Sequence, residues 1–278
     1  MFTEQMAWQI ADEVAGALRV RPVADDLVSV YLTGGLPRND FTPERSEVDL
    51  FFILESHCHD WSAVKVFEQL AFIKEVDRSW GGGVRRPRPC VDVGPWVAID
   101  LVPRKDNASK QDVIRLLRRS GMKYLTIYAF DFVACARPIF GRDIREALLV
   151  IDPRELVPDR LRSLFETLTR YAHDISPEWA DKEAVEGHIT KCSTFEVARA
   201  LFLLYGDRTL KKQPLFERFE KCVPEFQGKG FFRDLFAEYL DASFLGRLTT
   251  AERVHFFSEC LRFAEGAVNL VCPGNAQS

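Results

Sequence analysis

The chain has 278 residues, of which 47% are hydrophobic and 28% are charged, and its formal net charge is −4 at pH 7. This length and apolar content are enough for one large core or two modest ones, so we expect one or two domains. A mildly acidic chain is not typical of a general nucleic-acid-binding protein, which is normally basic, so nucleic acid is a less favoured partner.

The chain begins with a predicted helix and two predicted strands. Apolar residues recur at helical spacing over residues 3–18, and Thr3 is a suitable N-cap. Residues 27–32 and 48–54 are apolar and rich in strand-forming side chains, and the first run stops at Gly34 and Gly35. We therefore predict a strand, a glycine turn, a polar loop and a second strand.

The glycine turn and the second strand carry candidate functional groups. Two glycines at a strand end let backbone N–H groups approach a bulky anion, because no β-carbon stands between them. Glu47 and Asp49 are two residues apart on a strand, so their carboxylates project to one face. Such oxygen ligands suit Mg²⁺, which takes further ligands from water and substrate phosphates. The alternative is an edge strand with surface acids beside a plain turn.

The next stretch contains metal-ligand residue types at short spacing. His57, Cys58, His59 and Asp60 precede a helical pattern over residues 61–76. Neighbouring donors at a helix start rarely close a tetrahedral zinc site without ligands from elsewhere in the chain. We therefore favour the start of a helix over a zinc site.

A glycine- and proline-rich loop over residues 81–89 carries Arg85, Arg86 and Arg88. These arginines have two interpretations: they contact phosphates of a nucleic acid or nucleotide, or they are charges on a solvated loop. The more frequent role of such a run is the solvated loop.

A third carboxylate is expected from the strands that follow. Residues 90–93 and 96–102 are apolar runs parted by Gly94 and Pro95, which predicts a hairpin. Asp100 lies inside the second run, where an unpaired buried carboxylate would be unfavourable. We predict that Asp100 joins Glu47 and Asp49 at the metal.

The remaining sequence is mostly helical in pattern. Residues 109–119 predict a short helix, and residues 123–134 are compatible with either a strand or a buried helix. The composition changes near Ile151, after which we expect a helical bundle. Its predicted helices cover residues 160–173, 184–205, 214–222, 231–245 and 250–271.

The seven cysteines contain no C-x-x-C pair, which predicts reduced thiols in a cytoplasmic protein. The N-terminus lacks a basic region, and no apolar run reaches the ~18 residues that a membrane span needs. We expect neither secretion nor membrane insertion. The sequence does not indicate an oligomeric state.

These motifs resemble those of a known enzyme superfamily. Gly34-Gly35, Ser46-Glu47-Val48-Asp49-Leu50 and Asp100 resemble the Gly-Ser…Ser-Asp-x-Asp-Leu…Asp/Glu pattern of the polymerase β-like nucleotidyltransferases. Gly35 stands where Ser is usual, Glu47 stands where the first Asp is usual, and Arg38 and its neighbours replace a second glycine common in the loop. The resemblance implies an α+β fold: a small mixed-sheet nucleotidyltransferase domain over residues 1–150, then an all-α bundle over residues 151–278.

Two further segments resemble aminoglycoside nucleotidyltransferases and their relatives, the second of them the adenylyltransferases of the streptomycin/spectinomycin type. Residues 137–144 are similar to the Leu-Tyr-Gly-x-Asp-Leu segment that closes their catalytic domain. Residues 191–212 are similar to the helix, glycine turn and Ser-Lys segment whose Arg and Lys reach the triphosphate. By this resemblance Arg199 and Lys211 bind the nucleotide, with Lys212 as the substitute for Lys211. The alternative is that the lysines are solvated loop charges.

The resemblance implies a Mg²⁺-dependent nucleotidyltransferase that moves a nucleoside monophosphate from an NTP, preferably ATP, to a hydroxyl of a small, aminoglycoside-like molecule, as in antibiotic resistance. Glu47, Asp49 and Asp100 would hold the metal, with Asp100 as base or third ligand, and Gly34, Gly35 and Ser46 would bind phosphates. Asp181 and Glu183 are candidates for receiving a cationic sugar. Two alternatives stay open: a toxin-type enzyme that modifies tRNA or protein, and a relative with weakened catalysis that still binds nucleotide.

Overall fold

A computed structural model describes residues 2–43, 46–58, 61–82, 89–119, 121–173, 190–240 and 247–273. The chain divides into two compact units, Met1–Ile151 and Asp152–Ser278. The sequence predicted a domain boundary between residues 150 and 151, and the structure divides the chain one residue later. His59, Asp60, Arg85, Arg86, Arg88, Asp181 and Glu183 lie outside the described residues.

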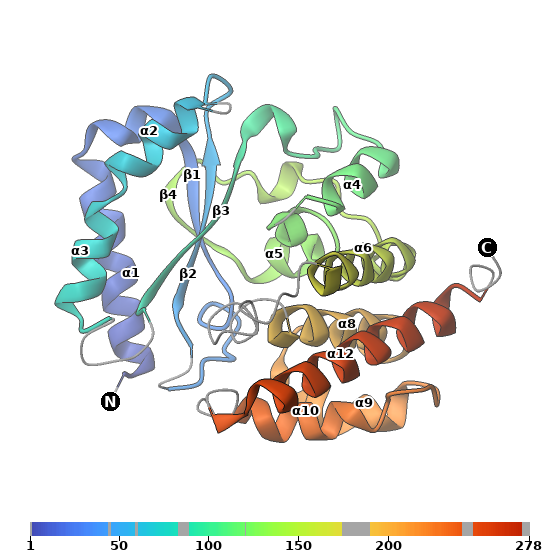
Figure 1. The fold of residues 1–278 in the computed structure, drawn as a ribbon. Helices are drawn as coiled ribbons and strands as arrows, with labels where there is room; N and C mark the ends of the chain where they lie inside the picture. The colour runs from blue at the N-terminus through green and yellow to red at the C-terminus, as the bar shows by residue number, and fades with distance from the viewer. Residues whose placement is uncertain are drawn as a thin grey trace. The chain divides into compact units, whose positions relative to one another are not determined.

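The N-terminal unit combines a mixed sheet with flanking helices (Figure 1). Its strands and helices, in chain order, are α1 (Glu4–Arg19), η1 (Pro22–Asp26), β1 (Leu27–Thr33), β2 (Val48–Leu54), α2 (Trp61–Gln69), α3 (Phe72–Ser79), β3 (Val91–Ala98), η2 (Ile99–Leu101), α4 (Lys110–Leu117), η3 (Met122–Leu125), α5 (Ala129–Cys135), β4 (Arg137–Gly141) and η4 (Arg145–Ala147). The predicted first helix is confirmed, including its cap: the Thr3 hydroxyl accepts a hydrogen bond from the backbone N–H of Met6. The two predicted strands that follow are confirmed as β1 and β2.

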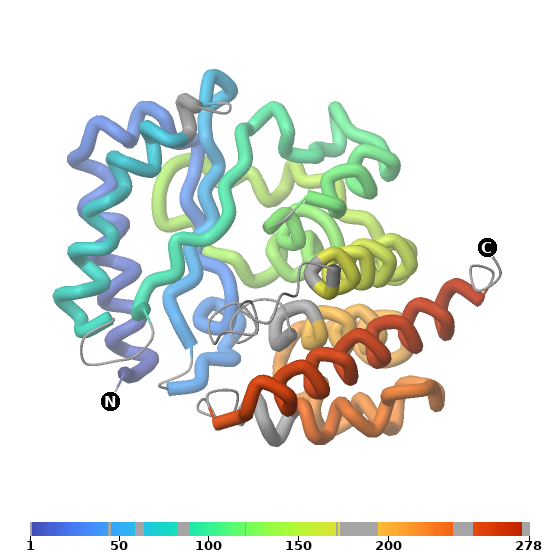
Figure 2. The backbone as a smooth tube through the Cα atoms, viewed as in Figure 1, coloured from blue at the N-terminus to red at the C-terminus, as the bar shows by residue number. Residues whose placement is uncertain are grey.

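The four described strands are ordered β3-β2-β1-β4. β1 runs antiparallel to β2 and β4, whereas β2 runs parallel to β3. The carboxyl end of β1 therefore lies at the same edge of the sheet as the amino ends of β2 and β3. The backbone trace in Figure 2 shows β1 and β2 running side by side along the sheet. The register places Thr33 beside Asp49 and Asp49 beside Asp92.

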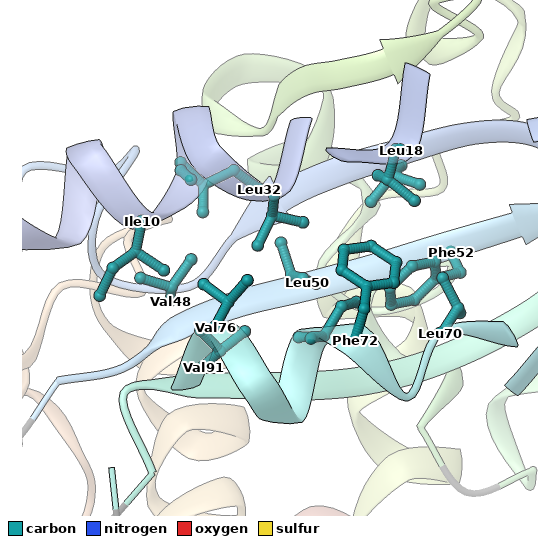
Figure 3. Close-up of a cluster of buried hydrophobic side chains, with 14 of the residues drawn as sticks. Ile10, Leu18, Leu32, Val48, Leu50, Phe52, Leu70, Phe72, Val76 and Val91 are labelled. Carbon is teal, nitrogen blue, oxygen red and sulfur yellow. The ribbon is translucent and has the colours of Figure 1, made fainter. Parts of the chain in front are cut away.

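Alternating side chains of β2 enter two separate cores, as the two-residue period of a strand requires. Val48, Leu50 and Phe52 pack on one face of the sheet with side chains of α1 and α3 (Figure 3). Phe51 and Ile53 pack on the other face, with side chains of η3 and α5. Both faces are buried, so β2 is apolar over most of its length and polar only where it begins.

The predicted hairpin over residues 90–102 is wrong. Residues 91–98 form one strand, β3, which continues through Gly94 and Pro95 with an irregularity in its pairing to β2. A β-carbon on Gly94 would overlap the backbone oxygen of Leu50, so the glycine permits a close approach of two strands and does not mark a turn. The chain then turns into η2, which contains Asp100.

The structure corrects one more predicted helix and decides one alternative that the sequence left open. The helix predicted over residues 61–76 is broken into α2 and α3, with Leu70 and Ala71 between them. Residues 123–134, which were compatible with a strand or a helix, belong to η3 and α5. Leu125 and Phe132 of this segment are buried against β1 and β2, which explains its high apolar content.

The described part of the C-terminal unit consists of helices and their connections. The helices are α6 (Pro153–His173), α8 (Thr190–Tyr205), α9 (Lys212–Cys222), α10 (Phe231–Leu240) and α12 (Thr250–Val271). Phe219, Phe232 and Phe263 form an aromatic centre, and the rings of Phe219 and Phe232 lie 4.2 Å apart. The helix predicted over residues 250–271 is confirmed, whereas α6 begins seven residues before its predicted start and contains Pro158.

The described helices and cysteines can be compared with the predicted lack of a membrane span and the predicted reduced thiols. None of them combines the length and the apolar composition that crossing a bilayer requires. The cysteines whose side chains are described are free thiols, as predicted.

Candidate functional site

The loop after β1 is held tightly against the start of β2. Gly34 has a φ angle of 75°, a left-handed conformation that favours glycine, and a β-carbon here would overlap the Asp49 carboxylate. Thr33 adds a hydrogen bond from its hydroxyl to the backbone oxygen of Asp49 (3.3 Å). The glycine turn and the acidic start of β2 therefore meet at one point.

The second half of this loop is closed by its own hydrogen bonds. The Asp40 N–H donates to the Gly35 carbonyl at 2.9 Å, and the Thr42 N–H donates to the Ser46 hydroxyl oxygen at 2.8 Å. A β-carbon on Gly35 would stand 3.0 Å from the Asp40 backbone oxygen, closer than ordinary packing permits. Gly35 and Ser46 thus shape the loop, and their predicted contact with phosphates stays a prediction.

Three carboxylates gather where β2 and β3 begin. Glu47, Asp49 and Asp92 each offer an oxygen, and these oxygens lie within 4.8 Å of one another. Glu47 and Asp49 share a face because they are two residues apart, and the parallel register puts Asp92 beside Asp49. Glu47 and Asp49 are partly buried and Asp92 is exposed, so the cluster is open to solvent on the side of β3. We call these three residues the acidic trio.

The prediction that Asp100 meets Glu47 and Asp49 is wrong. β3 pairs with β2 from Val91 beside Val48 to Ala98 beside Leu54, so Asp100 follows the far end of the strand. Eight residues separate it from Asp92, which corresponds to as much as about 25 Å along an extended strand. Asp100 instead lines a surface hollow with residues of α4.

The carboxyl group of Asp49 has an altered proton affinity. Its pKa is raised from 3.8 to about 7, first by burial and then by the negative charges of Asp92 and Glu47. The positive charges of Lys123 and Arg38 act in the opposite direction but do not restore the ordinary value. Three neighbouring carboxylate oxygens are the kind of ligand that a hard divalent cation accepts, and such a cation would offset their mutual repulsion.

Cationic and aromatic side chains lie on the face of the sheet where Asp49 projects. Arg38, in the loop after the glycines, pairs with Asp131 of α5 at 3.2 Å, and both side chains are almost fully buried. Lys123 of η3 lies 5.6 Å from the ring centre of Tyr124. Burial raises the pKa of the Tyr124 hydroxyl, and the charge of Asp49 adds to this effect. The acidic trio is thus faced by two cations held in a structured environment.

A small crevice adjoins the glycine turn. It is lined by side chains and backbone from the end of β1, the loop, η3 and α5: Thr33, Gly34, Pro37, Tyr124, Asp131, Phe132, Cys135 and Ala136. The crevice is too narrow for a nucleotide. Its walls fix the position of the glycine turn relative to η3 and α5.

The residues predicted to bind the triphosphate lie in the C-terminal unit. Arg199 of α8 donates to the Glu196 carboxylate at 2.9 Å, and Arg160 of α6 contacts the other oxygen of Glu196 at 3.3 Å. The Glu196 side chain is only 6% exposed, so these arginines compensate a buried charge. Lys211 precedes α9 and is exposed, and the adjacent Lys212 begins that helix. The proposed contact of Arg199, Lys211 or Lys212 with a nucleotide stays a prediction.

Sequence reasoning missed Asp92, Arg38 and Lys123. Asp92 lies within a predicted strand, but the predicted hairpin placed it on a different strand from Asp100, the predicted third carboxylate. Arg38 and Lys123 carry no local signal, since a single cation in a loop or at a short helix is usually a surface charge.

Comparison of the chain with protein-family models, with curated proteins and with solved structures found no match in any of the three.

Proposed function

We propose that this chain is a Mg²⁺-dependent nucleotidyltransferase that transfers a nucleoside monophosphate from an NTP to a hydroxyl group of a small molecule. The observation that carries the proposal is the acidic trio beside Gly34: three oxygen donors within 4.8 Å, at a glycine turn that closes directly over Asp49. A nucleotidyl transfer needs charge neutralisation at the phosphates and a carboxylate near the attacking hydroxyl. The trio offers groups for both tasks.

In this proposal Glu47 and Asp49 hold the metal, and Asp92 replaces Asp100 as the third carboxylate. Bound Mg²⁺ would neutralise phosphate charge and draw Asp49 into its ionised form at neutral pH. Asp92 is the exposed member of the trio, so it is the group that an acceptor molecule can approach. It takes the proton from the acceptor hydroxyl.

The reaction breaks one phosphorus–oxygen bond and forms another. The acceptor oxygen attacks the α-phosphorus in line, the bond from the α-phosphorus to its bridging oxygen breaks, and pyrophosphate leaves with that oxygen. Arg38 and Lys123, whose charges act on Asp49, are suited to stabilise the negative charge of the phosphates. The resemblance assigns Arg199 and Lys211 to the departing pyrophosphate.

The experiment is a transfer assay with each of the four NTPs labelled at the α-phosphate, in the presence of Mg²⁺. Acceptors are a panel of aminoglycosides, total tRNA and a cell lysate, because the last two detect a toxin-type activity. The variant Asp49→Asn is expected to abolish transfer, whereas Asp100→Asn, a matched change at the far end of β3, is expected to retain it.

The proposal fails if no nucleotide yields transfer to any acceptor, or if Asp49→Asn transfers at the rate of the unmodified chain. Calorimetry with Mg²⁺ and each NTP adds a separate measurement. Binding heat without transfer would favour a relative that has kept the nucleotide site and lost catalysis.

A further inference from the structure

A second cluster of metal-ligand side chains lies at the opposite end of the sheet. Asp26 is the last residue of η1, and His57 and Cys58 follow β2. The pairing of Leu27 with Leu54 brings these segments together, and the Glu55 N–H donates to the Asp26 carbonyl at 3.0 Å. β1 is seven residues long, so this cluster stands about 20 Å from the acidic trio.

The three donor atoms are close enough to share one ion. His57 Nε2 lies 2.9 Å from Asp26 Oδ1, and Cys58 Sγ lies 3.9 Å from the same oxygen. All three donors lie within 4.8 Å of one another. In a tetrahedral zinc site, adjacent N, O and S ligands are about 3.4 to 3.7 Å apart. The two distances to Asp26 Oδ1 lie on either side of this range, so side-chain adjustment on binding would bring all three donors to one ion.

The chemical identity of the donors selects the metal. An imidazole nitrogen and a thiolate sulfur are poor ligands for Mg²⁺ or Ca²⁺, which prefer oxygen, but they are preferred ligands for Zn²⁺. The sequence alone offered only adjacent residues and no distant partner. Asp26, which is 31 residues before His57, is the ligand that folding adds.

We propose that Asp26, His57 and Cys58 bind one Zn²⁺ ion, with water as the fourth ligand. The Cys58 side chain closes the inner side of the site, because it is 1% exposed. The His57 side chain is 65% exposed, which leaves the outer side open to solvent and to the ion. On binding, the thiol of Cys58 releases its proton to solvent as the sulfur–zinc bond forms, while neutral His57 binds through Nε2.

A simpler role for the cluster is an Asp26–His57 ion pair that secures the turn after β2. The two roles differ in what they require of Cys58. The ion pair needs only the carboxylate and the imidazole, whereas the zinc site needs the sulfur. The decisive measurement is therefore one that detects a metal–sulfur bond.

The experiment titrates metal-free full-length protein with Co²⁺ and then with Zn²⁺. We expect one equivalent of Co²⁺ to give a sulfur-to-metal charge-transfer band and the strong visible absorption of a tetrahedral ion, and Zn²⁺ to displace it. Cys58→Ser is expected to abolish the charge-transfer band, and His57→Gln, a change at an exposed side chain, to weaken Zn²⁺ binding by at least about 100-fold. Cys90→Ser is the matched control, because Cys90 is an equally buried thiol of the same unit outside the cluster.

Asp49→Asn separates this proposal from the proposed function, since it should leave the cobalt spectrum unchanged. Circular dichroism of the metal-free variants verifies that each one folds. The zinc proposal is overturned if the unmodified protein gives no charge-transfer band, or if the band persists in Cys58→Ser. It is also overturned if His57→Gln binds Zn²⁺ as tightly as the unmodified chain.

Discussion

The backbone of Gly34 lies directly against the side-chain carboxylate of Asp49, so that no β-carbon fits between them. This contact joins the end of β1 to the start of β2 at the acidic trio. Gly34 also has a positive φ angle, which a residue with a side chain adopts only at a cost. The geometry of the candidate metal site therefore depends on a residue that supplies no ligand.

Gly34→Ala is expected to lower the free energy of unfolding and to weaken binding of Mg²⁺ or Mn²⁺. The left-handed backbone costs about 1 to 2 kcal/mol for alanine, and the Asp49 carboxylate must move in addition. Urea unfolding and metal titration measure the two effects. Gly16→Ala is the control: Gly16 lies in α1 with open space around it, so the change should stabilise the protein by about 0.5 to 1 kcal/mol. Equal metal affinity in both variants would contradict the prediction.

The stability of the protein should fall as the pH rises between 3.8 and about 7, the ordinary and folded-state pKa values of Asp49. The folded state holds the Asp49 proton more tightly than the unfolded state does, so raising the pH through this range favours unfolding. Asp49→Asn removes this effect and should be about 1 to 4 kcal/mol more stable than the unmodified chain at about pH 8, and little different at about pH 4. Urea unfolding across this range measures the difference.

Added Mg²⁺ should reduce the advantage of Asp49→Asn at high pH, because the cation stabilises the ionised trio of the unmodified chain. For the same reason, Mg²⁺ should bind the unmodified chain more weakly as the pH falls below about 7. A stability difference that is constant with pH would contradict the assignment of the raised pKa to Asp49.

Asp92→Asn should reduce nucleotidyl transfer, whereas Asp100→Asn should leave it unchanged. Asp92 lies beside Asp49, so its loss should reduce nucleotidyl transfer by about 100-fold or more, as expected for a general base or a metal ligand. Asp100 lies beyond the far end of β3, and its substitution should leave kcat and KM for the proposed transfer close to those of the unmodified chain. Steady-state kinetics with the nucleotide identified in the transfer assay measures both. A larger loss of transfer in Asp100→Asn than in Asp92→Asn would contradict this assignment and favour Asp100 as the third carboxylate.

Tyr31→Phe is expected to destabilise the N-terminal unit without changing metal binding. The buried Tyr31 hydroxyl accepts a hydrogen bond from the Ile144 N–H at 2.7 Å and donates one to Asp143 at 3.1 Å. Burial raises the pKa of this hydroxyl to about 12, so it stays protonated. Removing it takes this acceptor from a buried N–H group, which costs about 1 to 3 kcal/mol. Urea unfolding measures the loss, and an unchanged midpoint would contradict it.

Arg199→Met and Lys211→Met should separate structural stabilisation from nucleotide binding in the C-terminal unit. Arg199 compensates the buried carboxylate of Glu196, so its loss should lower the free energy of unfolding by about 1 to 3 kcal/mol. Lys211 is exposed, and its loss should change stability by less than about 0.5 kcal/mol. Calorimetry with the NTP then tests the triphosphate contact. Unchanged nucleotide affinity in both variants would show that neither residue contacts the phosphates.

Local sequence pattern was sufficient for much of the N-terminal unit. The capped helix α1 and the strands β1 and β2 followed from apolar periodicity. These features depend on residues close in sequence, where backbone geometry alone relates one side chain to the next. The pairing of Glu47 with Asp49 on one face has the same origin.

Long-range pairing decided the rest of both sites. The sequence offered two acids, Asp92 and Asp100, in the segment after the second strand, and only the parallel register of β2 with β3 placed Asp92 beside Asp49. In the same way, only the pairing of Leu27 with Leu54 brought Asp26 to His57 and Cys58. Register is set by the packing of whole strands in the core, where a shift along the strand would misplace many buried side chains at once, and that cooperative choice leaves no local trace in the sequence.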